Sequence, residues 1–356
     1  MTNSAVCELN GQKIAEVFGK NGIDVSLVGF NRGAAFTLFE FSVNPETKVS
    51  HIWKLENSVA AALSVENVRF VVPIPGKEAI GVEVPNKRRR TVQFSSFNSA
   101  LKKSSFNVPI VLGKDVYGKR EIVDLAMLPH LLIAGRQGSG KTAFLDSLIC
   151  SVLKTKSPED VKLALIDLKG AEYHVYNGMP NLLVPVITDP LVALEVFDKL
   201  VEEIEWRIFL FSKAGAKKID DYNRKVENGE YSGEKLPYIV AIVDEYSSLM
   251  LEHGKRFELQ LKRILAVARF CGIHLVLSTN KCSADVITGV IKSNFPSQIA
   301  FAVPSALSSR IVIDQIGAEE LLDKGDMLFC LGNSRQPVRL QGALVKDFGK
   351  IINPDS

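Results

Sequence analysis

A glycine-rich stretch between an apolar run and a helical pattern is the clearest chemical signal in the sequence. The stretch 135–142 reads G-x-x-x-x-G-K-T, after the apolar run 131–134 and before the helical pattern 143–153. Glycines at this spacing let main-chain N–H groups surround an anion, and the start of the next helix adds partial positive charge. The spacing therefore predicts a loop that binds nucleotide phosphates, made of Gly135, Arg136, Gln137, Gly138, Ser139, Gly140, Lys141 and Thr142.

The last two residues of this loop have separate predicted roles. Lys141 is expected to reach the β- and γ-phosphates, and the Thr142 hydroxyl is expected to bind Mg²⁺. The alternative is a glycine-rich turn that holds a lysine by chance. The strand and helix patterns on either side favour the phosphate loop.

An acidic pair follows a second apolar run about a hundred residues further on. The run is 238–243, and Asp244 and Glu245 come next. Alone, such a pair at the end of a strand is usually only solvated, but beside a phosphate loop it has a specific use. We predict that Asp244 holds Mg²⁺ through its water shell and that Glu245 polarises the attacking water. An oriented water is needed for hydrolysis, so the pair favours an enzyme over a nucleotide store.

A third apolar run, 274–279, ends in polar residues. In sheets of this kind a polar side chain between the nucleotide-binding strands can contact the γ-phosphate. Asn280 is therefore a candidate catalytic residue that hydrogen-bonds this phosphate or the water. The alternative is an ordinary asparagine in a turn.

Composition and charge exclude several classes of protein. Of the 356 residues, 46% are hydrophobic, which is enough for a core and excludes a disordered chain. Residues 1–120 hold 16 basic and 10 acidic residues, whereas the other 236 hold 27 basic and 30 acidic residues. Any contact of the C-terminal part with nucleic acid must therefore come from local loops. The basic run Lys87–Arg90 is either a solvated loop or a phosphate contact.

The cysteines and the apolar runs indicate the compartment. Five scattered cysteines without a C-x-x-C pair suit a reduced, cytoplasmic protein rather than a disulfide framework or a zinc site. The longest apolar runs are too short to span a bilayer, and the first residues lack the pattern of a signal peptide. We therefore expect a cytoplasmic protein.

The chain divides into two parts and a tail. Residues 1–113 mix short helical and strand patterns and predict a small α+β domain. Residues 114–345 alternate apolar strands with helices, which predicts an α/β domain with a mostly parallel sheet covered on both faces. Residues 346–356 form the tail. The expected strands of the second domain are 131–134, 163–166, 239–243, 275–277 and 299–301.

From residue 22 to residue 345 the sequence resembles the motor part of FtsK/SpoIIIE-type DNA translocases. This resemblance implies a RecA-like ATPase motor domain over 114–345, preceded by the family's α domain. It also implies a ring of six copies around double-stranded DNA, which is held with little sequence preference, and ATP with Mg²⁺ bound between subunits. The blocks that carry it include Val72–Lys77, Gly81–Asn86, Leu112–Asp115, Met127–Gly135, Ile166–Lys169, Asp285–Gly289 and Lys324–Met327.

The resemblance also assigns roles to four basic residues. Arg269 matches the arginine finger that completes the site of a neighbouring subunit in trans, although an exposed helix arginine is the alternative. Lys281, Lys292 and Arg310 match positions on DNA-facing loops. Phosphates need only a cation, so Lys and Arg suffice there. Arg310 also suits the subunit interface, and both roles stay open.

The sequence departs from the family at a few positions. Residues 279–282 read Thr-Asn-Lys-Cys where the family has Thr-Gln-Arg-Pro, so Asn280 is one methylene shorter than the usual glutamine. Ala306 stands at a basic pore position, and Leu168 replaces a proline. The family's membrane anchor and its C-terminal winged helix are not expected in this chain. It is therefore a minimal motor or a trimmed piece of a longer one.

Two other functions remain open at this stage. One is an FtsK-like secretion ATPase that moves polypeptide. The other is a DNA-coupling or segregation ATPase that does not translocate processively. Chromosome, plasmid, phage genome and mobile element are equivalent cargoes for a motor that holds phosphates, and the sequence indicates neither direction, speed nor a recruiting partner.

Overall fold

The computed structural model describes residues 3–44, 47, 49–128, 130–332, 336–346 and 348–349. These residues form two compact units. The small unit comprises Met1–Val92, Lys114–Arg120 and Arg339–Gln341, and the large unit comprises Gln93–Gly113, Glu121–Val338 and Gly342–Ser356. The domain boundaries after residues 113 and 345 stay predictions.

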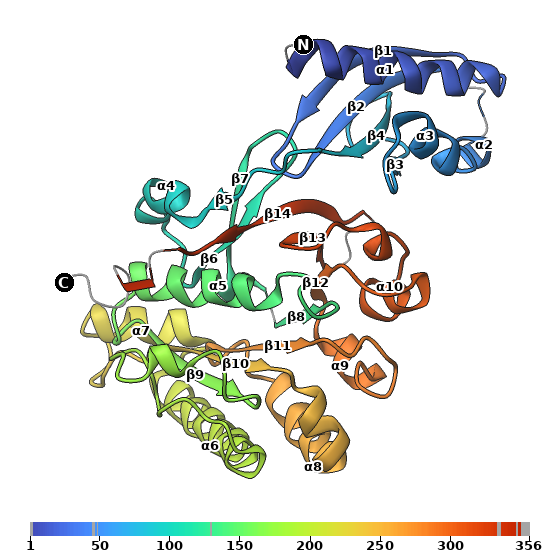
Figure 1. Cartoon of the computed structure of the whole chain (residues 1–356). Helices are drawn as coiled ribbons and strands as arrows, with labels where there is room; N and C mark the ends of the chain where they lie inside the picture. The colour runs from blue at the N-terminus through green and yellow to red at the C-terminus, as the bar shows by residue number, and fades with distance from the viewer. Residues whose placement is uncertain are drawn as a thin grey trace. The chain divides into compact units, whose positions relative to one another are not determined.

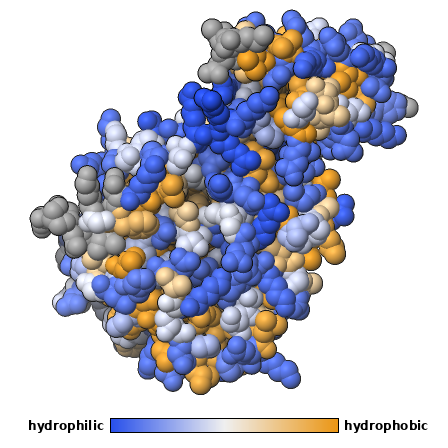
Figure 2. Space-filling model, in the orientation of Figure 1, coloured by the Kyte–Doolittle hydropathy of each residue, from blue (hydrophilic) through white to orange (hydrophobic). Residues whose placement is uncertain are grey.

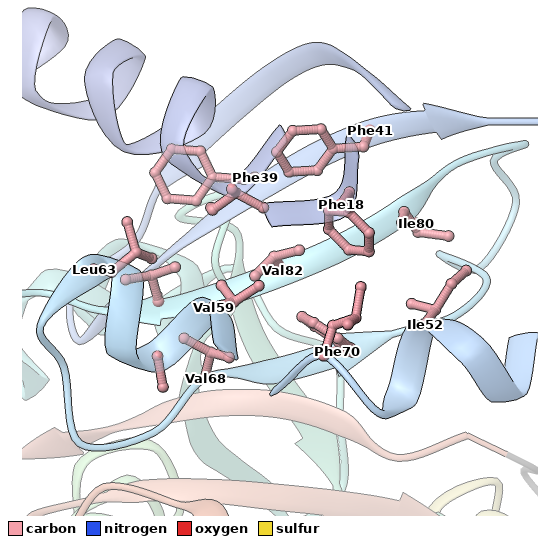
Figure 3. Close-up of a cluster of buried hydrophobic side chains, with 14 of the residues drawn as sticks. Phe18, Phe39, Phe41, Ile52, Val59, Leu63, Val68, Phe70, Ile80 and Val82 are labelled. Carbon is pink, nitrogen blue, oxygen red and sulfur yellow. The ribbon is translucent and has the colours of Figure 1, made fainter. Parts of the chain in front are cut away.

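The small unit has a four-stranded antiparallel sheet in the order β1-β2-β4-β3. Phe39 and Phe41 of β2 belong to its buried core, where the Phe18 ring lies beside the rings of Phe41 and Phe70 (Figure 3). Burial of these rings holds helices and sheet together. The elements of this unit are α1 (Asn3–Lys20), β1 (Val25–Arg32), β2 (Phe36–Val43), α2 (Val49–Trp53), α3 (Glu56–Leu63), β3 (Arg69–Val71) and β4 (Ile80–Pro85).

A ten-stranded sheet forms the centre of the large unit. Its order is β7-β6-β14-β13-β12-β8-β11-β10-β9, and β5 pairs with β14. The run from β12 to β9 is parallel throughout, whereas β13 is antiparallel to β12. The strands are β5 (Val92–Gln93), β6 (Pro109–Lys114), β7 (Arg120–Asp124), β8 (Leu131–Ala134), β9 (Val161–Asp167), β10 (Tyr238–Asp244), β11 (Ile273–Thr279), β12 (Ser297–Phe301), β13 (Asp326–Leu331) and β14 (Val338–Leu344).

Helices cover both faces of the parallel strands, with α5 on one face and α6 and α8 on the other (Figure 1). Local sequence signals set the ends of α6. The Asp189 carboxylate accepts from the N–H groups of Leu191 and Val192, and Gly215 ends the helix with φ of 60°. The helices are α4 (Asn98–Lys102), α5 (Lys141–Thr155), α6 (Pro190–Ala214), α7 (Ile219–Glu227), α8 (Ser247–Leu265), α9 (Gly289–Asn294) and α10 (Ala306–Ile313).

The predicted α/β fold with a mostly parallel sheet is confirmed. The five strands expected from apolar runs are β8, β9, β10, β11 and β12, and they are the five parallel strands of the sheet. The strands β6, β7, β13 and β14 were not predicted. Their sequences lack the regular alternation with helices by which the parallel strands are recognised.

The surface mixes polar and apolar side chains. In the face shown in Figure 2, hydrophobic residues lie scattered among hydrophilic ones, and single exposed apolar residues are normal for a folded protein. Among the residues that the structure describes, no helix is both long and apolar enough to cross a membrane.

A candidate nucleotide site

The glycine-rich loop joins the end of β8 to the start of α5, as the sequence predicts. Two of its glycines are required by close packing. A Cβ on Gly140, whose φ is 117°, would lie 2.5 Å from the main-chain nitrogen of Gly325, and a Cβ on Gly135 would lie 2.6 Å from Cβ of Phe301. A side chain at Gly140 or Gly135 would therefore force the loop away from Gly325 or Phe301.

Lys141 and Ser139 carry the polar groups that face into this loop. The Lys141 ammonium donates to the carbonyls of Gly135 at 2.7 Å and Arg136 at 3.1 Å. Burial lowers the pKa of Lys141, and the nearby Glu245 and Asp244 carboxylates oppose this shift. The Ser139 hydroxyl is buried without a hydrogen-bond partner among the described residues. An orphaned hydroxyl inside a turn of main-chain N–H groups fits a phosphate.

The acidic pair lies at the same edge of the sheet as the loop, because both follow the carboxyl ends of parallel strands. Asp244 ends β10, and its register partner in β9 is Asp167. Burial raises the pKa of Asp244, while the Ser278 hydroxyl and the Lys169 charge oppose the shift. Glu245 follows with φ of 58°, a backbone conformation rare outside glycine, so the chain turns sharply at this residue.

The Glu245 carboxylate is held on several sides. Its Oε1 accepts from the Ser247 hydroxyl at 2.5 Å, the Thr279 hydroxyl at 2.9 Å and the Asn280 N–H at 3.2 Å. Burial raises the pKa of Glu245, but these hydrogen bonds and the charge of Lys169 outweigh burial and lower it. The carboxylate is therefore ionised and fixed in one orientation.

Lys169 lies in this site, although no role was predicted for it from the sequence. Its ammonium lies 3.2 Å from Oε2 of Glu245, and its side chain is 47% exposed. The loop that presents Lys169 is shaped by Asp167, whose carboxylate accepts main-chain N–H groups at distances of 2.8 to 3.3 Å. The sequence signal that could have identified Lys169 is its position just after β9, the strand that pairs with β10. The N–H groups bound by Asp167 are those of Lys169, Gly170, Glu172 and Tyr173.

The predicted residues Thr142 and Asn280 also lie at this edge. Thr142 is the second residue of α5, and Asn280 follows β11, which runs between β8 and β10. The main chain of Asn280 contacts Glu245. The role predicted for its amide toward the γ-phosphate stays a prediction.

The donor set at this edge fits Mg²⁺ bound together with a nucleotide. The described residues contain no group of three or more His, Cys, Asp or Glu side chains able to hold a metal. Mg²⁺ usually keeps several waters and binds one or two protein oxygens plus phosphate oxygens. Thr142 and Asp244 are the residues predicted to supply these protein oxygens.

Arg269 lies away from the phosphate loop of its own chain. It is exposed and sits in the turn between α8 and β11. This turn is at the edge where the parallel strands begin, whereas the phosphate loop is at the edge where they end. The seven residues of β11 separate the two edges by about 20 Å. Arg269 therefore cannot serve the nucleotide bound by its own chain.

The structure brings two of the predicted DNA-contacting residues together. The Lys292 ammonium donates to the main-chain carbonyl of Arg310 at 2.8 Å and pairs with Asp314 at 2.8 Å. Lys281 follows Asn280 and pairs with Asp285 at 3.1 Å. The Lys292 ammonium is less accessible than that of Lys281, because the Lys292 side chain is only 24% exposed and its contacts are internal.

A cavity of about 660 Å³ lies away from this edge and contains none of the predicted site residues. It is bordered by α6, β9 and the segment before β10. Its walls are mainly apolar, so it has a different chemistry from the polar phosphate loop. Lining residues include Leu183, Leu200, Trp206, Tyr222, Tyr231 and Leu236.

Together, the phosphate loop before α5, the acidic pair after β10 and the parallel sheet define a P-loop ATPase. The sequence matches the FtsK/SpoIIIE family over residues 97–284 and the FtsK alpha domain over residues 2–86. This chain belongs to the FtsK/SpoIIIE family.

The chain is also similar to curated relatives and to solved structures. It is 44% identical over 336 residues to the DNA translocase FtsK of Treponema pallidum, covering 94% of this chain and 42% of that protein. It is 45% identical over 338 residues to the DNA translocase FtsK of Caldanaerobacter subterraneus, covering 94% of this chain and 47% of that protein. The chain thus spans less than half the length of these two relatives.

Two solved structures have the same fold. One is the pCW3 conjugation coupling protein TcpA, in a monomer form with ATPγS, at a TM-score of 0.67 and 23% identity over 98% of this chain and 99% of that chain. The other is the cytoplasmic domain of the Type VII secretion ATPase EccC of Thermomonospora curvata. Its TM-score is 0.65 at 21% identity, over 74% of this chain and 34% of that chain.

Proposed function

We propose that this chain is the motor part of a DNA translocase, which hydrolyses ATP to move along double-stranded DNA. The observation that carries the proposal is the convergence of Lys141, Thr142, Asp244 and Glu245 at one edge of the sheet, in a chain 44% identical to a DNA translocase. A phosphate loop and a held carboxylate are the parts that hydrolysis of a phosphoanhydride needs.

In the proposed mechanism, Lys141 and the loop N–H groups hold the β- and γ-phosphates of ATP. Thr142 and Asp244 would hold Mg²⁺, which neutralises charge on the phosphates when it is bound. Glu245 accepts a hydrogen bond from the attacking water and orients it for in-line attack. Asn280, which follows β11, would hydrogen-bond the γ-phosphate.

We propose that Arg269 acts on the nucleotide of a neighbouring copy. Its exposure and its place at the opposite edge of the sheet support action in trans. A guanidinium there would stabilise the charge that develops on the γ-phosphate. This role requires a neighbouring copy, and for the assembly we propose the six-subunit ring of the resembled family.

Lys281, Lys292 and Arg310 are the proposed contacts to DNA phosphates in the pore of this ring. Phosphate contacts carry no sequence information, so the motor should run on any duplex and bind it with strong salt dependence. The name shared by these curated relatives, DNA translocase, supports DNA over a polypeptide as the cargo.

The test is the steady-state ATPase rate of the chain without DNA, with single-stranded DNA and with long linear duplex, using Lys141→Ala as the blank. Strong stimulation by duplex alone is the expected result. An ATPase rate that is the same with and without DNA would contradict the proposal. It would favour an ATPase that secretes polypeptide or one that a partner protein activates. Stimulation without displacement of a protein bound to the duplex would favour a coupling or segregation ATPase.

The trans role of Arg269 has its own test. Arg269→Ala subunits should bind ATP and fail to hydrolyse it. Mixing them with Lys141→Ala subunits should restore part of the activity, because an interface that takes its loop from an Arg269→Ala subunit and its arginine from a Lys141→Ala subunit has both groups intact. Absence of any restored activity on mixing would argue against action in trans.

A further inference from the structure

The small unit presents a run of four basic residues that the motor mechanism does not use. Lys87, Arg88, Arg89 and Arg90 follow β4, and all four side chains are exposed. Residues 1–120 hold 16 basic and 10 acidic residues, so this run supplies four of the six excess positive charges. Most of the net positive charge of residues 1–120 therefore comes from this one loop.

The loop is fixed at both ends to the turn between β1 and β2. Before the run, the Asn86 N–H donates to the Ala35 carbonyl at 2.9 Å, and the Asn86 side-chain amide donates to the Gly33 carbonyl at 3.0 Å. Within the run, the Arg90 N–H donates to the Ala34 carbonyl at 2.9 Å. The run is therefore held on the surface by bonds from the main chain and from the Asn86 side chain at its two ends.

A hydrogen bond from the Thr37 hydroxyl to Oδ1 of Asn86, at 2.7 Å, completes the first anchor. Both polar ends of this asparagine side chain thus bind the small unit. A loop anchored in this way loses little conformational freedom when it meets a ligand, which favours binding.

The buried acidic residues of the small unit are neutralised by other cations. Glu83 pairs with Arg69 at 3.1 Å and with Arg339 at 2.5 Å, and Glu40 pairs with Lys77 at 2.7 Å. The side chains of Lys87, Arg88 and Arg90 make no hydrogen bond or ion pair with any residue that the structure describes. Their charges are therefore available to a partner outside the chain.

We propose that the loop Lys87–Arg90 is a second contact to the phosphate backbone of duplex DNA, on the small unit and additional to the pore residues. The inference rests on the proposed function. Duplex DNA carries one negative charge per about 1.7 Å of its axis, a density that suits consecutive cations. Guanidinium groups also match phosphate oxygens in pairs. An acidic protein surface is the weaker partner, because the run offers no apolar or aromatic residue to anchor a protein interface.

The test compares two triple variants of the full chain by anisotropy of a fluorescent duplex over about 50 to 200 mM salt. One is Lys87→Gln/Arg88→Gln/Arg90→Gln. The matched control, Lys13→Gln/Lys20→Gln/Lys54→Gln, removes three exposed cations elsewhere in the small unit. Thermal unfolding of both variants verifies that they fold.

The loop variant should bind duplex at least tenfold more weakly than wild type at about 0.1 M salt, and its slope of log affinity against log salt should fall by about two to three. The control should change much less. If wild type binds duplex tightly and the two variants have equal slopes of log affinity against log salt, the loop contact is overturned and the proposed function is not. A wild type that binds no duplex would overturn both the loop contact and the proposed function. Unchanged DNA binding with weakened self-assembly would overturn the inference by identifying a protein surface as the partner.

Discussion

Replacing Lys169 by methionine should slow hydrolysis without removing the nucleotide. The change keeps the length of the side chain and deletes the ammonium 3.2 Å from Oε2 of Glu245. At that distance, an effective dielectric constant of about 20 gives an attraction of about 5 kcal/mol. The lysine is 47% exposed, so solvent screening reduces the usable part to about 1–2 kcal/mol. If this energy keeps the carboxylate in its working orientation, kcat falls about 5- to 30-fold.

The assay is steady-state ATP turnover with duplex DNA, together with equilibrium binding of a non-hydrolysable ATP analogue. We expect KM and analogue affinity to change by less than about threefold, since the loop groups that hold the phosphates stay intact. Lys169→Arg should recover part of kcat, because a guanidinium can still reach the carboxylate. The control is Lys199→Met, which removes an exposed lysine from an ion pair on α6.

Two results would refute this reasoning. A wild-type kcat in Lys169→Met would mean that Ser247, Thr279 and the Asn280 N–H alone orient Glu245. A large rise in KM at constant kcat would mean that Lys169 acts on the nucleotide and not on the carboxylate.

Three further predictions follow from the same geometry. Glu245→Gln should bind ATP normally but lose at least about 100-fold in kcat. Filter binding measures the first property and steady-state turnover the second. Turnover at the wild-type rate would mean that Glu245 does not orient the attacking water. Gly140→Ala should abolish analogue binding, because its Cβ would lie 2.5 Å from the nitrogen of Gly325, and retained binding would show that the loop can shift. Burial lowers the pKa of His130 in the folded protein to about 3. Between this pKa and the ordinary histidine pKa of about 6.5, the unfolded state therefore binds one more proton than the folded state. Stability is then fully present above about pH 6.5 and falls by about 3 kcal/mol toward pH 4. His130→Asn should flatten this loss in urea unfolding, and an unchanged pH dependence would contradict it.

The sequence predicted the parts of the fold that repeat a simple pattern. Each parallel strand is a short apolar run between helices, and the runs 131–134 and 239–243 also end in recognisable chemistry. Their grouping at one edge follows from parallel strands alone, so the phosphate loop and Glu245 were expected to meet. The strands β13 and β14 depend on pairing between distant segments, which local pattern does not reveal.

The surroundings of Glu245 could not be derived in the same way. Ser247, Thr279 and Lys169 come from three different segments, and their contact with the carboxylate depends on strand order and on the turn at Glu245. The loop that presents Lys169 depends on the Asp167 carboxylate binding four main-chain N–H groups. An aspartate at the end of a strand does not by itself predict such an arrangement.

The most direct test of the central claim is displacement of a third strand from a triplex at the end of a long linear duplex, during ATP turnover. Translocation should give release that requires ATP, depends on the length of flanking duplex and disappears in Lys141→Ala and Glu245→Gln. Duplex-stimulated ATP turnover without any release of the third strand would contradict translocation.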